Sequence, residues 1–435
     1  MNSFYIETYG CTANKADSYI ISNLLLNAKY NLTTIDKADF IIVNTCAVKE
    51  QTENKIKERL KKLHKLYGKD STKHIIIAGC LPHIASEYIE VIKDLVPNFS
   101  AIIDLSNIDE IEAILSEIKK GKKNLVLSSE KSVDKSRFLI NHKKGKTTGI
   151  VPISEGCLGS CAYCCVKNAR GKLNCYDPEN IVRNVEHQLK QGIKQIYLTS
   201  QDCSIYKYNE TRLVDLVEQI INLDYKFFLR VGMINPSFLI NSLDQLITIF
   251  NFNKVYHFLH VPIQAGSNTV LKKMQRPYLI SDIVEPIEII RQKFPYLTIS
   301  TDIICGFPEE SEYDFYKTIN LIKWLKPEIL NISKFTARPG TIAKNMKQLG
   351  SRTIKERSIR LSKIFRNSLF TINEKWNDWK GEVLVLHKGN EENQAFGRNF
   401  AYKNVFINNY NDSYGKFVNV RVDKVIRFNL YGTIV

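Results

Sequence analysis

The sequence predicts an α/β protein in three segments: an N-terminal parallel α/β domain over 1–130, a partial (β/α)6 TIM-type barrel over 143–372, and a small β-barrel over 374–435. Two observations predict this fold class. Short β-branched or aromatic runs alternate with helical stretches through the first two segments, and apolar and polar positions alternate between close turns in the last. The length of 435 residues fits more than one domain, and 44% hydrophobic with 24% charged residues excludes a disordered or coiled-coil chain.

The first segment contains three short apolar runs that each end on a cysteine. FYIETYGC closes on Cys11, FIIVNTC on Cys46 and HIIIAGC on Cys80, with helical stretches at 17–29 and 50–67 between them. Runs of this length and composition are typical of buried parallel strands, whose carboxyl ends meet at one edge of a sheet. We therefore expect these three cysteines, the strand-end trio, to converge on a shared site rather than to be inert core residues.

A polar, Lys- and Ser-rich stretch over 128–148 is interpreted as a linker. The strand–helix alternation then resumes with six strand candidates: GIVPISEG, QIYLTSQ, FFLRVGM, VYHFLHVPIQ, LTISTDIICGF and EILNISKF. Six βα units predict a partial barrel with its chemistry at the strand C-termini. Polar residues at those ends are candidate ligand contacts, with ordinary strand-end polarity as the alternative: Ser200, Gln201, Arg230, Gln264 and Asp302.

The most specific motif is a CxxxCxxC formed by Cys157, Cys161 and Cys164, here called the loop trio. Ten cysteines without an export signal favour reduced thiols and metal ligation over disulfides. Three thiolates on one loop can hold a four-iron cluster and leave one iron open for a chelating ligand. A zinc loop with Cys165 or Cys175 as fourth ligand is the alternative.

Motifs along the whole chain resemble those of the radical S-adenosylmethionine (SAM) methylthiotransferases. They are ETYGCTANKADS, VNTCAVK, AGCLP, EGCLGSCAYCCVKNARGKL, LTSQD, RVGMINP, VPIQAGS, TDIICGFPEES, ARPGT, FGRNF and KFVNVRVDKVIRFNLYG. The resemblance implies an N-terminal methylthiotransferase domain, a radical SAM core and a C-terminal TRAM domain. GCTANKADS and RVGMINP resemble the archaeal/eukaryotic branch, which acts on tRNA carrying N6-threonylcarbamoyladenosine at position 37.

The resemblance also implies the reaction and its cofactors. Adenine C2–H is replaced by a methylthio group through radical chemistry, with SAM and two [4Fe-4S] clusters, the auxiliary one on the strand-end trio and the radical SAM one on the loop trio. Tyr163 is expected beside the adenine of SAM, Arg230 or Gln264 at a carboxylate, and Asp302 at the amino group or ribose. The implied partners are the tRNA anticodon stem-loop, an external electron donor of ferredoxin or flavodoxin type, and a sulfur donor.

The charge balance fits a polyanionic partner. There are 61 Lys and Arg against 45 Asp and Glu, a formal charge of +16, with basic helices predicted near 55–65 and 352–366. In the last segment, the interleaved Phe396, Arg398, Phe400 and Tyr402 are candidates for stacking on nucleotides. The absence of a long apolar stretch and of a secretory signal predicts a cytoplasmic protein without a membrane span.

Other activities remain open. These are methylthiolation of another tRNA adenosine or of a ribosomal-protein side chain, and a non-catalytic iron–sulfur protein that binds RNA. The sequence departs from the family at Cys165, Cys203 and Cys305, which replace commoner non-cysteine residues and are interpreted as small buried hydrophobic residues.

Overall fold

The computed structural model describes residues 2–128, 131–410 and 412–435. The chain packs as two compact units. The first comprises Met1–Asn141, Pro152–Asn184 and Thr336–Lys344, and the second comprises His142–Val151, Val185–Phe335 and Asn345–Val435. The loop that carries the CxxxCxxC motif therefore packs in the same unit as the N-terminal sheet.

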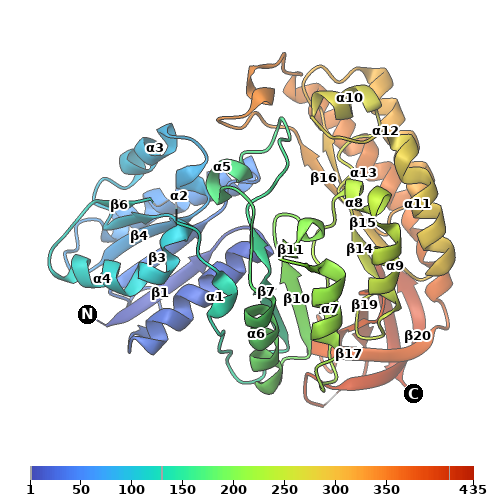
Figure 1. Cartoon of the computed structure of the whole chain (residues 1–435), viewed down its shortest axis with the longest axis horizontal. Coiled ribbons are helices and arrows are strands. Elements are labelled where there is room, and N and C mark those ends of the chain that lie inside the picture. The colour runs from blue at the N-terminus through green and yellow to red at the C-terminus, as the bar shows by residue number, and fades with distance from the viewer. Residues whose placement is uncertain (1, 129–130, 411) are drawn as a thin grey trace. The chain divides into compact units, whose positions relative to one another are not determined.

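The first unit is built on a six-stranded parallel sheet in the order β2-β1-β3-β4-β5-β6 (Figure 1). Helices α2 and α3 supply one buried apolar cluster with the sheet, and α1 and α4 supply a second. The elements are β1 (Ser3–Thr8), α1 (Thr12–Asn27), β2 (Asn31–Leu32), β3 (Phe40–Thr45), α2 (Glu50–Tyr67), β4 (His74–Gly79), α3 (Glu87–Leu95), β5 (Ala101–Ile103), α4 (Ile111–Lys119) and β6 (Leu125–Leu127). Strands β3 and β4 are buried along their whole length, which explains why they have no polar face in the sequence.

The interpretation of 128–148 as a linker is wrong around Lys135 and Ser136; residues 129 and 130 lie outside the described part of the chain. Lys135 and Ser136 are buried, and the Lys135 ammonium binds carboxylates of Asp17 and Glu155. The side chain of Asn184 donates hydrogen bonds to two carbonyls of the same segment. Local polarity suggested a solvated stretch because the buried partners lie far away in the sequence.

The second unit contains the six parallel strands expected of the partial barrel. Strands β13-β10-β7 and β14-β15-β16 form two ladders, and parallel bridges at Leu229–Val255 and Met233–His260 join them. The strands are β7 (Thr148–Pro152), β10 (Gln195–Thr199), β13 (Phe228–Arg230), β14 (Phe258–His260), β15 (Thr298–Cys305) and β16 (Ile329–Lys334). The helices are α6 (Pro178–Lys190), α7 (Leu213–Ile221), α8 (Pro236–Asn241), α9 (Leu243–Asn251), α10 (Asn268–Lys273), α11 (Ile280–Lys293), α12 (Glu312–Leu325) and α13 (Ser351–Asn373).

The C-terminal strands close into the predicted small barrel, in the order β17-β18-β19-β21-β20. They are β17 (Lys380–Lys388), β18 (Ala395–Asn399), β19 (Asn404–Ile407), β20 (Phe417–Ile426) and β21 (Asn429–Ile434). The barrel is filled by apolar side chains such as Val383, Val405 and Leu430, with Trp376 buried against them. All of these residues belong to the second unit.

An aromatic seam joins this small barrel to the parallel strands of the same unit. Tyr402 is 8% exposed, its hydroxyl lies 2.7 Å from the Tyr197 hydroxyl, and its ring contacts Tyr256 and Phe258. Phe400 packs edge-on against His257 at 5.3 Å. The expectation that Tyr402 stacks on nucleotides is therefore wrong, because its ring is buried inside the protein, whereas Phe400 is half-buried.

Candidate active site

The three strand-end cysteines follow β1, β3 and β4, which are neighbours in the sheet. Cys46 and Cys80 are buried, whereas Cys11, the N-cap of α1, is exposed. The Cys11 thiol donates to Asn14 Oδ1 at 3.3 Å, and Cys80 Sγ lies 3.9 Å from the same oxygen. Cys11 and Cys80, which are 69 positions apart in the sequence, thus both lie near Asn14 Oδ1.

Two glycines allow the backbone to approach Cys46 closely. Gly10 has φ of 106°, and a Cβ there would lie 2.6 Å from Cys46 Sγ. Gly79 has φ of 97°, and its Cβ would lie 2.3 Å from the carbonyl oxygen of Thr45. Any other residue at either position would force the strand ends apart as well as strain the backbone.

Burial governs the protonation of these thiols. It raises the pKa of Cys80 to about 12, Arg170 opposes this rise, and the nearby Cys11 and Cys46 add to it. Burial also raises the pKa of Cys46. The free thiols of Cys46 and Cys80 are therefore neutral near pH 7, and a metal centre that binds them as thiolates releases protons when it is loaded.

The loop trio is held on a loop closed at its base by a two-residue ladder between β8 (Ser154–Glu155) and β9 (Asn174–Cys175). The loop curls around Gly159, where a Cβ would lie 3.4 Å from Cys157 Sγ and 3.8 Å from Cys161 Sγ. Burial raises the pKa of Cys164 to about 11, and the neighbouring Cys161 adds to the rise. Tyr163 is half-buried between these two cysteines.

The donor sets of both trios fit iron–sulfur clusters. No three Cys, His, Asp or Glu side chains among residues 2–128, 131–410 and 412–435 lie close enough to hold a single metal ion. A four-iron cluster does not require that convergence, because each thiolate binds its own iron at a separate corner. Three thiolates without a fourth protein ligand also suit a cluster with one open iron better than structural zinc.

A further buried group borders the Cys46 end of the strand-end trio. Arg338, 6% exposed, donates to the Ala47 carbonyl at 2.8 Å and pairs with Glu53 of α2 at 2.6 Å. The Cys165 thiol lies 3.5 Å from the same carbonyl. Arg338 belongs to the segment 336–344, which packs in the first unit. Cys165 is buried, as expected of a small hydrophobic residue.

The polar residues predicted at the barrel strand ends fall into separate groups. Asp302 accepts from Asn331 at 2.7 Å and pairs with His260 at 3.0 Å, and its backbone carbonyl accepts from the Gln264 N–H at 2.8 Å. Gln264 has φ of 75°, a backbone conformation that supports its bridge to Ile303. Gln264 and Asp302 are thus held together.

The other predicted strand-end residues lie on neighbouring strands. The Ser200 hydroxyl contacts the buried Cys203 thiol at 3.3 Å, and Gln201 follows half-buried in the same turn. The Arg230 guanidinium lies over the rings of Tyr197, Phe258 and Tyr402, 4.7 to 5.1 Å from their centroids. Its Nε is buried and makes no hydrogen bond within the described chain.

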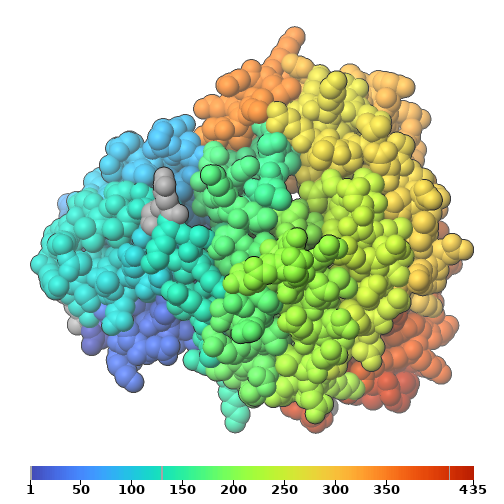
Figure 2. Space-filling model, viewed as in Figure 1, coloured from blue at the N-terminus to red at the C-terminus, as the bar shows by residue number. Residues whose placement is uncertain are grey.

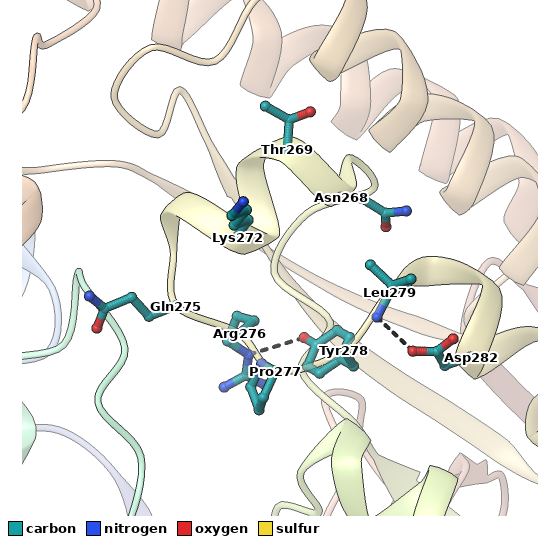
Figure 3. Close-up of a pocket in the computed structure, with 9 residues that line it drawn as sticks. All are labelled: Asn268, Thr269, Lys272, Gln275, Arg276, Pro277, Tyr278, Leu279 and Asp282. Atoms are coloured by element: carbon teal, nitrogen blue, oxygen red, sulfur yellow. Dashed lines mark hydrogen bonds between the residues drawn. The ribbon is translucent and has the colours of Figure 1, made fainter.

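A surface pocket of about 710 Å³ lies where α10 meets α11 (Figure 3). This segment is exposed on the visible face of the molecule (Figure 2, yellow). Arg276, which lines the pocket, is already bonded to the Tyr278 hydroxyl at 3.0 Å and to the Pro262 carbonyl. None of the site residues predicted from the sequence lines this pocket.

Sequence reasoning missed the residues that support the trios, chiefly Asn14, Asp17, Lys135, Glu155 and Arg170. Asn14 and Asp17 lie in the ETYGCTANKADS string and Arg170 in the loop motif, so membership of these motifs was the available signal. Most of their partners could not be inferred, because contacts such as Arg170 with Asp17 and Lys135 with Asp17 join distant parts of the chain.

Comparison with known proteins agrees with this architecture. Residues 3–100 match the uncharacterized protein family UPF0004, residues 151–322 the radical SAM superfamily, and residues 381–435 the TRAM domain. The probable threonylcarbamoyladenosine tRNA methylthiotransferase of Pyrococcus horikoshii is 36% identical over 440 residues, covering all of both chains. The threonylcarbamoyladenosine tRNA methylthiotransferase of Drosophila melanogaster is 32% identical, covering 99% of this chain and 77% of its own.

A fold of the same kind occurs in a solved structure of the radical S-adenosylmethionine methyltransferase TsrM from Kitasatospora setae. It covers 77% of this chain and 73% of its own with a TM-score of 0.56 and 11% sequence identity, a likeness of fold alone.

Together, the parallel strands and the CxxxCxxC loop define a radical SAM enzyme, a class that works with a [4Fe-4S] cluster and SAM. The chain belongs to the family of the threonylcarbamoyladenosine tRNA methylthiotransferases. None of its described helices is long and apolar enough to cross a membrane.

Proposed function

We propose that the protein replaces the C2 hydrogen of N6-threonylcarbamoyladenosine at position 37 of tRNA with a methylthio group. The observation that carries this proposal is the pair of cysteine trios in one compact unit of a chain related over its full length to threonylcarbamoyladenosine tRNA methylthiotransferases. A radical enzyme that only removes hydrogen needs one cluster, whereas insertion of sulfur needs a second group that carries it.

The loop trio would hold the radical SAM cluster. When bound, this cluster and SAM supply the carbon radical that removes hydrogen from the substrate. The chain's own contribution is to hold the cysteines: the Gly159 N–H donates to Cys157 Sγ at 3.2 Å, and the Cys164 N–H donates to the Cys161 carbonyl at 3.0 Å. Tyr163 would pack beside the adenine of SAM.

The strand-end trio would hold an auxiliary [4Fe-4S] cluster that carries the sulfur to be transferred. Buried thiols on adjacent strands, close-approach glycines and a cation beside Cys80 support this assignment. A donor would have to replace the sulfur consumed in each turnover, and an external electron donor of ferredoxin or flavodoxin type would start each cycle.

Polar groups at the strand ends of the partial barrel would bind SAM. Asp302, fixed by His260 and Asn331, suits the SAM amino group or ribose, because both are hydrogen-bond donors. Arg230 suits a carboxylate, because its guanidinium contacts three aromatic rings and its Nε makes no hydrogen bond within the described residues. Gln264, Ser200 and Gln201 complete this proposed set.

The anticodon stem-loop of tRNA would bind along α13. This helix carries six Lys or Arg and one Glu, whereas the small barrel from 376 carries eight Lys or Arg against six Asp or Glu. Lys355, Lys363 and Arg366 are exposed, and no ion pair is found for them among the described residues. Exposed unpaired cations at helical spacing are what phosphate attraction requires.

The test is nucleoside analysis of tRNA by mass spectrometry. After anaerobic reconstitution, the protein with SAM and dithionite should convert N6-threonylcarbamoyladenosine in tRNA to its 2-methylthio derivative. Unchanged 2-methylthio nucleoside in a deletion strain would contradict the proposal and favour a ribosomal-protein side chain or another adenosine. Failure to form 5′-deoxyadenosine would favour a non-catalytic iron–sulfur RNA-binding protein.

Two variants distinguish the roles of the two cysteine trios. Cys161→Ala should abolish 5′-deoxyadenosine formation, whereas Cys46→Ala should retain it and lose only methylthiolation. Loss of 5′-deoxyadenosine in both would contradict the assignment of separate roles. The reconstituted chain should hold near eight irons, a number that follows from two four-iron clusters.

A further inference from the structure

Three buried charged side chains, Asp17, Lys135 and Arg170, form a closed network with the partly buried Glu155 beside the strand-end trio. The Lys135 ammonium binds Asp17 at 3.1 Å and Glu155 at 2.7 Å, and the Arg170 guanidinium binds the same two carboxylates at 2.8 and 2.5 Å. Two cations face two carboxylates, so the network is balanced without any further group. Its balance means that removal of either cation leaves the network with one excess negative charge.

Arg170 has a second set of contacts that Lys135 lacks. Its Nε donates to Cys80 Sγ at 3.2 Å, and its Nη2 donates to Asn14 Oδ1 at 3.1 Å. That oxygen also accepts the hydrogen bond of the Cys11 thiol. Arg170 therefore touches one cysteine of the trio directly and a second through Asn14, whereas the Lys135 ammonium makes no contact with sulfur among the described residues.

The position of Arg170 in the chain links this network to the other trio. Arg170 is the last residue of α5 (Val166–Arg170), six positions after Cys164, and Glu155 precedes Cys157 by two. The two ends of the CxxxCxxC loop are thus fastened to each other, and Arg170 fastens the loop to Cys80 and to Asp17 of α1.

We propose that Arg170 is a positioning residue for the auxiliary cluster: it donates to the Cys80 sulfur and thereby raises the reduction potential of that cluster. Hydrogen bonds and positive charge at a ligand sulfur favour the reduced, more negative cluster over the oxidised one. The inference rests on the proposed function, because it requires that the strand-end trio binds a cluster.

The experiment uses the full-length chain with Cys157→Ala, Cys161→Ala and Cys164→Ala, which retains only the strand-end trio. The midpoint potential of its cluster is measured by an electron paramagnetic resonance redox titration, with and without Arg170→Gln. Arg170→Gln should lower the ratio of reduced to oxidised cluster at a given potential at least tenfold, a shift of ~59 mV for a one-electron couple.

Lys135→Gln is the matched control, since it removes a buried cation from the same network without touching a sulfur. It should change that ratio less than threefold. Equal shifts for the Arg170 and Lys135 variants would overturn the proposal, because the effect would then be one of buried charge alone. No shift for Arg170→Gln would overturn it as well.

Arg170→Lys covers the case in which Arg170→Gln does not hold a cluster. Arg170→Lys keeps the charge but loses the Nε donor, so it should lower the ratio of reduced to oxidised cluster at least threefold. A ratio equal to that of the triple-alanine parent would overturn the proposal. Thermal melting of the metal-free chains checks that each variant folds. Iron analysis of the triple-alanine parent separates the two levels: no bound iron would refute the auxiliary cluster itself, whereas near four irons with no Arg170 effect would refute only this inference.

Discussion

Neutralising the exposed cations of α13 tests whether this helix binds tRNA. The variant replaces Lys355, Lys363 and Arg366 with Gln. The other cations of the helix form ion pairs within the protein. The buried Arg357 pairs with Glu310, Arg352 with Glu356, and Arg360 with Glu312. The triple variant therefore removes the unpaired charge and leaves the contacts that hold the helix in place.

The expected loss follows from counterion release. Each phosphate contact contributes about 0.7 to 0.9 to the slope of log Kobs against log salt concentration, so three contacts contribute about 2 to 3. At 0.15 M salt each contact is worth roughly four- to fivefold in affinity, and the triple variant should bind tRNA on the order of 100-fold more weakly.

The assay is fluorescence anisotropy with labelled tRNA across a range of salt concentrations, using metal-free protein. The matched control replaces Lys61, Lys62 and Lys65 of α2, three exposed cations on the first unit. An unchanged salt slope for the α13 variant would refute the reasoning. An equal loss for both variants would show that tRNA responds to the overall charge of the protein rather than to α13.

Three further predictions concern stability and are read from denaturation of the metal-free chain. Arg338→Met should lower the free energy of unfolding by about 3 to 5 kcal/mol, because the buried Glu53 carboxylate loses an ion-pair partner. The double variant with Glu53→Gln should lose less than the sum of the two single variants, and additive losses would contradict this. Tyr402→Phe should cost about 1 kcal/mol through its lost bond to Tyr197, and Tyr402→Ala about 3 to 5 kcal/mol; a neutral alanine variant would contradict the aromatic seam. Burial lowers the pKa of Lys403 to about 8 from 10.5, so the buried charge destabilises the folded chain fully below pH 8 and no longer does so above pH 10.5. Between these two pH values the free energy of unfolding of the wild type should rise by about 3 kcal/mol relative to that of Lys403→Met. A difference that does not change with pH would refute the shift.

The sequence predicts the central strands of the first sheet well, because strand identity depends on local composition. The FIIVNT and HIIIAG runs appear as β3 and β4, wholly buried, and the helix predicted over 50–67 has those bounds in the structure. Topology alone then places three cysteines at one edge of the sheet, since parallel neighbouring strands end there.

The sequence cannot predict side-chain partners that are distant along the chain. The polar residues around Lys135 favour a solvated linker because lysine is usually exposed, yet the carboxylates of Asp17 and Glu155 stabilise it inside the first unit. The alternation of aromatic and basic residues around Tyr402 favours nucleotide stacking. Its ring instead packs against strands of the parallel barrel, a contact that depends on tertiary structure.

The placement of both trios in one unit has a consequence for the proposed chemistry. Three contacts tie the CxxxCxxC loop and α5 to the strand-end region: Arg170 to Cys80, Cys165 to the Ala47 carbonyl, and Asn168 to the Ile84 carbonyl at 2.9 Å. The separation of the two cysteine trios is therefore set by packing inside the unit. A sulfur-carrying centre and a hydrogen-abstracting centre must meet the same carbon of one base in succession, and a fixed separation lets the base remain bound between the two steps. Loosening the Arg170 contact should then uncouple hydrogen removal from sulfur insertion and release 5′-deoxyadenosine without the methylthio product.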